Sequence, residues 1–310
     1  MNWHSPELDA LIAAALAEDV GPGDATVAAT IPPFAVGNAH ILAKQYLVCA
    51  GLPLAEKIFR VLDPRIHVEL RAQDGQHIHK SADLLHLTGK ASAILTGERT
   101  ALNFLGRLCG IATLTHLFVQ QLAGTRAKIR DTRKTTPGLR LLEKYAVKMG
   151  GGVNHRIGLY DAILLKENHI AVAGGVKAAL DRAHAYASSH MNINATSAYE
   201  AAGSPPNSPE AHSLPVQIEV RNESELREAL SAGAESVLLD NMTPAQARHC
   251  VEIVRAIRPS CIVEISGGIT LQNTRAYAET GADFLSSGAL AHSAPNADLS
   301  LLMDSIALEQ

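Results

Sequence analysis

The chain has 310 residues, of which 47% are hydrophobic and 19% charged, enough apolar side chains for one large globular domain or two linked ones. A net charge of −4 argues against nonspecific nucleic-acid binding by the whole chain. The four cysteines contain no C-x-x-C pair, and neither a cationic secretory region nor an apolar run of membrane-spanning length is evident. We therefore expect a cytoplasmic protein with reduced thiols and no membrane partner.

The N-terminal part of the chain mixes helices and strands without a repeating order. Five segments have the spacing of regular elements: helices at 7–18 and 53–62, and strands at 38–49, 66–70 and 84–88. Residues 96–124 carry apolar side chains at helical spacing, and they are long enough for two helices or for one that is kinked near Gly110.

From residue 126 onward, apolar strand patterns alternate with helical ones. The predicted strands are 126–130, 161–165, 216–220, 235–239, 261–265 and 282–285. The predicted helices between them are 138–149, 175–187, 223–232, 244–257 and 271–280. This alternation predicts a parallel sheet and favours an incomplete TIM-type barrel. A doubly wound sheet remains an alternative, although no G-x-G-x-x-G follows the first strand.

One segment does not fit the alternation. Residues 188–213 are rich in Ser, Asn and Pro, and they are too long for an ordinary connection between a helix and a strand. We interpret them as a polar surface insertion.

Basic side chains are concentrated in one part of an acidic chain. Between Arg126 and Lys166 the sequence has ten Lys/Arg against three Asp/Glu, which indicates a focused anion site. Arg133 and Lys134 follow the first predicted barrel strand and Lys166 follows the second, where the catalytic face of a barrel lies. Several cations around one small ligand suit a substrate with more than one negative charge. A surface ion pair is the alternative for each of them.

The last two predicted strands end in small, glycine-rich loops, Ser266-Gly267-Gly268 and Ser286-Ser287-Gly288. Such loops expose backbone N–H groups to phosphate, and late barrel loops often bind one. Glu219 and Asp240, at neighbouring strand ends, could accept hydrogen bonds from sugar hydroxyls or hold Mg²⁺. Chemistry alone thus predicts a phosphorylated sugar, a small anionic co-substrate and a metal.

Six sequence blocks together resemble the quinolinate phosphoribosyltransferase family, over nearly the whole chain. The blocks are EDVGPGD (18–24), GERTALNFL (97–105), DTRKTTPGLR (131–140), GGVNHRIGLYDAILLKENH (151–169), LLDNMTP (238–244) and EISGGIT (264–270). The resemblance implies an N-terminal α/β sandwich domain at 1–112, completed by 293–310, and an incomplete α/β barrel at 113–292. It also implies a homodimer with a shared active site, or a larger assembly such as a hexamer.

The resemblance further implies a site for two substrates, quinolinate and phosphoribosyl pyrophosphate, with Mg²⁺ as cofactor. The expected quinolinate-binding residues are Arg133, Lys134, His155, Arg156 and Lys166, with Arg99 supplied by the partner subunit. The expected phosphoribosyl pyrophosphate-binding residues are Glu219, Asp240, Ser266, Gly267, Gly268, Ser287, Gly288 and His292. Of these, Lys134, Lys166, Glu219 and Asp240 are the catalytic candidates, and Glu219 and Asp240 are the candidates for the metal.

Two features depart from the family pattern: the length of the 188–213 insertion, and Gln217 at a position where the family commonly has an acid. Three other functions remain as alternatives. The first is a relative of the same fold, either a transferase for another base such as nicotinate or the paralogous molybdenum-transport-associated protein. The second is a Schiff-base aldolase that uses Lys166, and the third is a binding protein without catalytic activity. The number of cations favours quinolinate, because two carboxylates need more positive charges than one.

Overall fold

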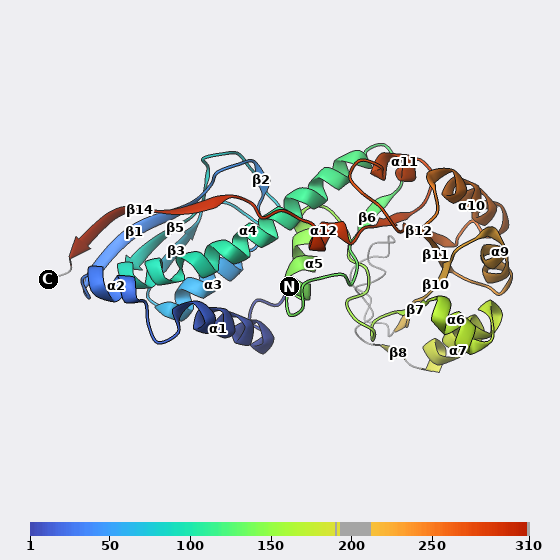
Figure 1. Cartoon of the computed structure of the whole chain (residues 1–310), viewed down its shortest axis with the longest axis horizontal. Helices are drawn as coiled ribbons and strands as arrows, with labels where there is room; N and C mark the ends of the chain where they lie inside the picture. Colours follow the sequence, from blue (N-terminus) through green and yellow to red (C-terminus); the bar gives the residue numbers. More distant parts are fainter. Residues whose placement is uncertain (190, 193–211, 309–310) are drawn as a thin grey trace. The chain divides into compact units, whose positions relative to one another are not determined.

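The computed structural model describes residues 1–189, 191–192 and 212–308, and the chain divides into two units (Figure 1). The first unit comprises Met1–His116, Thr136–Gly151 and Ala294–Gln310. The second comprises Leu117–Thr135 and Gly152–Ser293.

The first unit is built on a four-stranded antiparallel sheet in the order β14-β1-β5-β3. Its strands are β1 (Ala35–Ala43), β3 (His67–Leu70), β5 (Asp83–Lys90) and β14 (Leu299–Leu308), with a separate pair formed by β2 (Leu47–Val48) and β4 (His77–Ile78). Its helices are α1 (Pro6–Val20), α2 (Ala25–Thr30), α3 (Leu52–Leu62), α4 (Ala91–Gln121) and α5 (Arg140–Met149).

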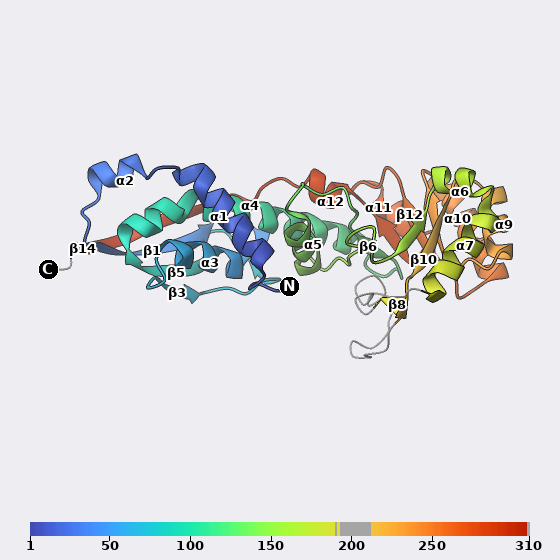
Figure 2. The ribbon, with the colours of Figure 1, turned by 90° about the horizontal axis from the view of Figure 1, so that it is seen from below.

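Buried and exposed side chains alternate along β1, which gives the sheet one face against which helices can pack. Ala35, Ala39, Ile41 and Ala43 are buried, while the residues between them are more exposed, so one face of the strand faces the core. Helices α3 and α4 run along the sheet in both views (Figures 1 and 2). The predicted α/β sandwich is confirmed.

The second unit contains six parallel strands in the order β6-β13-β12-β11-β10-β7. These are β6 (Lys128–Arg130), β7 (Ile163–Leu165), β10 (Val216–Val220), β11 (Ser236–Asp240), β12 (Ile262–Ser266) and β13 (Phe284–Ser286). The helices are α6 (Glu167–Ala173), α7 (Val176–Ser189), α9 (Glu223–Ser231), α10 (Pro244–Ile257), α11 (Thr274–Ala278) and α12 (Ala289–His292). Helices α6, α7, α9 and α10 lie outside the strands (Figures 1 and 2), as the predicted parallel-strand α/β domain requires.

The predicted insertion at 188–213 falls mostly outside the described residues. At its borders, β8 (Met191–Asn192) and β9 (His212–Ser213) pair with each other antiparallel. Strand β10 then begins at Val216, as the sequence pattern predicts.

The segment 136–151 belongs to the first unit, whereas the domain bounds expected from the sequence placed it in the barrel. Three contacts give the physical reason. Glu143 accepts hydrogen bonds from the Arg107 guanidinium, at 2.7 Å from Nη2, and the Tyr145 hydroxyl donates to Asp74 at 2.6 Å. Gly150 lies against the backbone of Ala112, where a side chain would not fit.

Residues 91–121 form one continuous helix, α4, which resolves the choice left open by the sequence. By length and composition α4 could cross a membrane, but 56% of its most apolar stretch is buried inside the protein, as in a core helix. Gly110 serves a close approach of two chain segments, because a Cβ there would clash with the carbonyl oxygen of Pro295.

We predict that Gly110→Ala destabilises the protein by about 1–3 kcal/mol, because the added Cβ forces a backbone shift. An ordinary helical Gly→Ala change stabilises by up to about 1 kcal/mol, so the sign of the effect is diagnostic. Urea denaturation measures it. Gly106→Ala is the graded control, since its Cβ would lie 3.1 Å from the carbonyl oxygen of Ala297 and needs only a small adjustment. A more stable Gly110→Ala variant would contradict the prediction.

Candidate active site

A cavity of about 680 Å³ lies where the six parallel strands of the second unit end. Because the carboxyl ends of parallel strands share one edge, residues distant in sequence meet there. The cavity brings together the predicted site residues Arg133, Lys134, His155, Arg156, Lys166, Glu219, Asp240, Ser266, Gly267, Gly268, Ser287, Gly288 and His292. Arg99 belongs to the first unit, where its side chain is 63% exposed.

Two guanidinium groups give the cavity a focused positive charge. Arg156 is buried, and Arg133 lines the same cavity. Burial lowers the pKa of Arg156, and the charge of Arg133 lowers it further, while Asp161 opposes both effects. Two neighbouring cations, one of them desolvated, are stabilised when an anion binds between them.

Two buried carboxylates hold the loop that carries His155 and Arg156. Asp131 accepts hydrogen bonds from the side-chain amide of Asn154 at 2.5 Å and from the backbone N–H of His155 at 2.8 Å. Asp161 accepts the backbone N–H of Ile157 at 2.7 Å. The Arg156 guanidinium also donates to the carbonyl oxygen of Ala162 at 3.0 Å. The cationic loop is therefore fixed by the fold itself.

Glu219 and Asp240 form an acidic pair on neighbouring strands. Burial raises the pKa of Glu219, and the charge of Asp240 raises it further, whereas Lys166 lowers it. Lys166 Nζ lies 3.8 Å from Glu219 Oε2. No group of three or more His, Cys, Asp or Glu side chains in the described part of the chain is arranged to hold a metal. Two carboxylates completed by substrate phosphates are a usual setting for Mg²⁺, so the pair fits a metal that binds together with a phosphate ligand.

The loop after β12 has an unusual backbone. Gly267 and Gly268 have φ of 94° and 63°, which a residue with a Cβ rarely adopts. Asn241, after β11, has φ of 54°, and its N–H donates to the carbonyl oxygen of Ser266 at 2.9 Å. A Cβ at Gly267 would clash with the Asn241 side chain. Asn241 is a non-glycine residue in this region, and strained residues of this kind gather at ligand sites, in agreement with a phosphate loop.

Gly288 joins residues that were predicted for different substrates. A Cβ at this position would lie 2.9 Å from Nε2 of His292 and 2.9 Å from Cδ of Lys134. The Ser287 hydroxyl is buried and donates to the carbonyl oxygen of Ile269 at 2.8 Å, which joins the two glycine-rich loops. Lys134 therefore lies beside the loop expected to bind phosphate.

Beneath the cavity lies a buried ionic network that the sequence did not predict. Glu264, in the middle of β12, is fully buried and accepts hydrogen bonds from Arg130 Nη1 at 2.8 Å and Gln217 Nε2 at 3.0 Å. Burial alone would raise the pKa of Glu264, but His155, Arg130 and hydrogen bonds from Gln217 and Ser286 lower it to about 2. The available signal was an acid inside the apolar strand CIVEI, which is costly unless paired.

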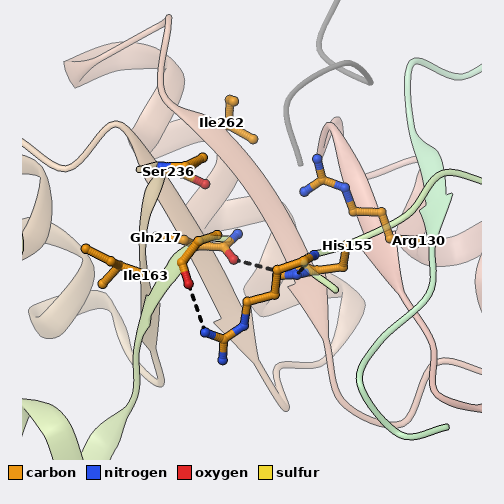
Figure 3. A pocket seen from close by; sticks show the side chains of 9 residues that line it. Arg130, His155, Ile163, Gln217, Ser236 and Ile262 are labelled. Atoms are coloured by element: carbon orange, nitrogen blue, oxygen red, sulfur yellow. Dashed lines mark hydrogen bonds between the residues drawn. The ribbon is translucent and has the colours of Figure 1, made fainter. Parts of the chain in front are cut away.

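A second cavity, of about 30 Å³, is lined by Arg130, His155, Gln217 and Ser236 among others (Figure 3). This volume is enough for one or two water molecules. His155 and Arg156 line both cavities, so these two polar side chains lie between them.

One short element differs from the sequence expectations. The helix α6 was not predicted, and its first turn is closed by the Lys166 N–H, which donates to His169 Nδ1 at 3.0 Å. In the first unit, the Thr136 hydroxyl donates to Glu143 of α5 at 2.8 Å.

Comparison with known proteins identifies the family. The profile described as quinolinate phosphoribosyl transferase, C-terminal domain, matches residues 111–204 and 196–302. The corresponding N-terminal domain profile matches residues 24–142. The chain belongs to the quinolinate phosphoribosyltransferase family. The two C-terminal matches overlap at residues 196–204, within the predicted insertion.

Relatives of this phosphoribosyltransferase-family chain match it over nearly its whole length. A probable nicotinate-nucleotide pyrophosphorylase (carboxylating) of Bacillus subtilis is 39% identical over 284 residues, 92% of this chain and 89% of that protein. A quinolinate phosphoribosyltransferase (decarboxylating) of Nicotiana tabacum is 37% identical over 317 residues, 98% of this chain and 84% of that protein. The structure of nicotinate-nucleotide pyrophosphorylase from Francisella tularensis has a TM-score of 0.84 at 35% identity, with 96% of each chain covered.

We predict that Glu264 makes this phosphoribosyltransferase-family chain sensitive to acid. Because folding lowers its pKa from 4.5 to about 2, its stabilisation is complete above pH 4.5 and is lost as the pH falls toward 2. In Glu264→Gln, the free energy of unfolding should be lower at pH 7 by about 3–5 kcal/mol, because the buried ion pair with Arg130 is lost. This free energy should also change less between pH 4.5 and 2 than in the wild-type protein. Urea denaturation across this range measures both effects. The control is Glu279→Gln, whose carboxylate is 49% exposed in its ion pair with Arg275; its free energy of unfolding should depend on pH as in the wild-type protein. If Glu264→Gln also showed the wild-type pH dependence, the prediction would be refuted.

Proposed function

We propose that this chain transfers the phosphoribosyl group of phosphoribosyl pyrophosphate to quinolinate and decarboxylates the product, giving nicotinate mononucleotide, CO₂ and pyrophosphate. This is a pentosyltransferase reaction of de novo NAD biosynthesis. The observation that carries the proposal is one cavity that joins the cations Arg133 and Arg156 to two glycine-rich loops and an acidic pair. Each of these three parts suits one part of the two substrates.

The cationic part would hold quinolinate, a small ring with two carboxylates. Arg133 and the buried Arg156 would form charge-assisted hydrogen bonds with them, and Lys134 and Lys166 would add charge. A nicotinate ring has one carboxylate, so it would leave part of this positive charge uncompensated. That difference favours quinolinate over nicotinate as the acceptor, and the family membership supports the same choice.

The other part would hold phosphoribosyl pyrophosphate. The loops at Ser266–Gly268 and Ser287–Gly288, with His292 beside them, would bind the 5′-phosphate, while Glu219 and Asp240 would face the ribose hydroxyls. The same two carboxylates would hold Mg²⁺ with the substrate phosphates, directly or through water. When bound, Mg²⁺ would neutralise charge on the departing pyrophosphate.

The chemistry would depend on position and charge rather than on a covalent nucleophile. The quinolinate nitrogen attacks the anomeric carbon as pyrophosphate leaves, through a state in which the ribose carries positive charge. Glu219 and Asp240 would stabilise that charge, and the arginines would keep the nitrogen aligned with the reacting carbon. Once the ring nitrogen is quaternised, the 2-carboxylate is lost as CO₂, and a proton replaces it on the carbon.

We also propose a cytoplasmic homodimer, or a larger assembly of such dimers, in which Arg99 of one subunit completes the quinolinate site of the other. Arg99 is exposed on α4, with Glu98 4.0 Å away as a weak ion-pair partner, so its guanidinium is available to an anion on another chain. Two such shared sites would follow from twofold symmetry.

A direct assay tests the function. Purified protein with Mg²⁺, phosphoribosyl pyrophosphate and quinolinate should release CO₂ and nicotinate mononucleotide in equal amounts. EDTA should abolish both products, and added Mg²⁺ should restore them. Product from nicotinate but not from quinolinate would refute the proposal. A covalent adduct between Lys166 and a carbonyl substrate, trapped by borohydride, would point instead to a Schiff-base aldolase.

Paired variants test the shared site. Arg133→Ala should raise the KM for quinolinate by about 30-fold or more, because a charge-assisted hydrogen bond contributes about 2–3 kcal/mol, and Arg99→Ala should do the same. A heterodimer of Arg99→Ala and Arg133→Ala subunits, isolated with two affinity tags, should recover about half of the wild-type activity, since one of its two sites is intact.

The matched control for this experiment pairs Arg133→Ala with Lys166→Ala. Both substitutions lie in the same unit, so neither site of that heterodimer is intact and activity should stay low. If the Arg99→Ala and Arg133→Ala heterodimer stayed equally inactive, Arg99 would not act across subunits.

A further inference from the structure

Three polar side chains form a layer inside the barrel, where apolar residues are usual. Arg130, Glu264 and Gln217 come from β6, β12 and β10, the first, third and fifth strands of the sheet. Side chains from alternate strands share a layer in the interior of such barrels. Both Arg130 Nη1 and Gln217 Nε2 donate to the same oxygen of Glu264, Oε2.

The hydrogen bond between Gln217 and Glu264 fixes which atom of the Gln217 amide faces His155. Because the Gln217 amide nitrogen donates to Glu264, the amide oxygen is left to face His155, and Nε2 of the imidazole lies 3.2 Å from it (Figure 3). A carbonyl oxygen can only accept, so His155 must carry its proton on Nε2. Glu264 Oε1, 3.6 Å from the same nitrogen, favours the same tautomer.

The other ring nitrogen of His155 has a matching role. Nδ1 accepts the backbone N–H of Arg156 at 2.7 Å, which requires that Nδ1 carry no proton. The network thus begins at the ion pair of Arg130 and Glu264, passes through Gln217 and His155, and ends at the backbone of a cationic residue in the large cavity.

We propose that Gln217 and Glu264 are positioning residues, which fix His155 as the Nε2–H tautomer so that its Nδ1 holds the backbone of Arg156 in place for a substrate carboxylate. The carboxylate part of this inference rests on the proposed function, whereas the tautomer does not. An amide suits position 217 because it can donate to Glu264 and accept from His155 at once. The acid that the resemblance leads us to expect at this position could accept from His155 but, without a proton, could not donate to Glu264, so this arrangement of hydrogen bonds is specific to chains with an amide here.

Two readouts test the inference. The first is the NMR spectrum of the ¹⁵N-labelled free protein, in which the signals of His155 are assigned by comparison with His155→Gln. They should show the Nε2–H tautomer in the wild-type protein and a mixture of tautomers in Gln217→Leu. Gln217→Leu should also raise the KM for quinolinate about tenfold, as expected for one lost positioning hydrogen bond, with kcat and the KM for phosphoribosyl pyrophosphate within about twofold. Ser236→Ala removes a polar group from the same small cavity and should leave all of these unchanged.

Several outcomes would overturn the inference. An Nδ1–H tautomer in the wild-type protein would do so whatever the variants show, and so would an unchanged His155 spectrum in Gln217→Leu. An equal rise in KM for both substrates would indicate a general structural role. Failure of the wild-type protein to use quinolinate would refute the proposed function, but the tautomer measurement would still decide this network.

Discussion

The ion pair between Glu264 and Arg130 is the interaction on which the second unit depends. A carboxylate enclosed among strands costs several kcal/mol unless a cation and hydrogen-bond donors satisfy it, and Arg130, Gln217 and Ser286 do so. Glu264 also lines the large cavity. An uncompensated negative charge there would repel an anionic substrate. By neutralising Glu264, Arg130 therefore stabilises the fold and keeps the cavity favourable for an anion. The position of Arg130 over the ring of Phe284, 3.3 Å from its centroid, fixes that cation in turn.

Lys134 and Lys166 follow consecutive barrel strands in the chain, but these two strands, β6 and β7, lie at opposite ends of the strand order in the sheet. Along the sheet, the strand that precedes Arg133 and Lys134 adjoins β13, whereas β7, which precedes Lys166, adjoins β10 and Glu219. Lys134 therefore neighbours a glycine-rich loop, and Lys166 neighbours the acidic pair. Two lysines that look equivalent in sequence would thus act on different parts of the reacting pair, one beside a phosphate and one beside the ribose.

Much of the fold and the site was predictable because local patterns carried it. Strand periodicity located β10 at Val216–Val220 to the residue. The candidate charged residues and glycine-rich loops that follow the predicted strands all line the cavity, while His155, Arg156 and His292 were assigned to the site only through the family resemblance. What failed needed a distant partner. The family resemblance placed 293–310 with the first unit, but no local pattern predicted that strand β14 pairs with β1, more than 250 residues earlier in the chain. The helix at 138–149 was predicted, but its place in the first unit depends on Arg107 and Asp74, which no local pattern reveals. The interior layer was missed for the same reason, since Glu264 is explained only by Arg130 and Gln217 on other strands.

The division of the chain into two interleaved units limits how the second unit could be separated from the first at the level of the gene. The backbone passes between the two units four times, at 116–117, 135–136, 151–152 and 293–294. No single continuous gene fragment encodes the barrel alone, because any fragment from 117 to 293 also carries α5 and removes it from Arg107 and Asp74. The barrel is thus a discontinuous unit, and a recombination event that exchanged residues 117–293 as one block would remove α5 from the core of the first unit.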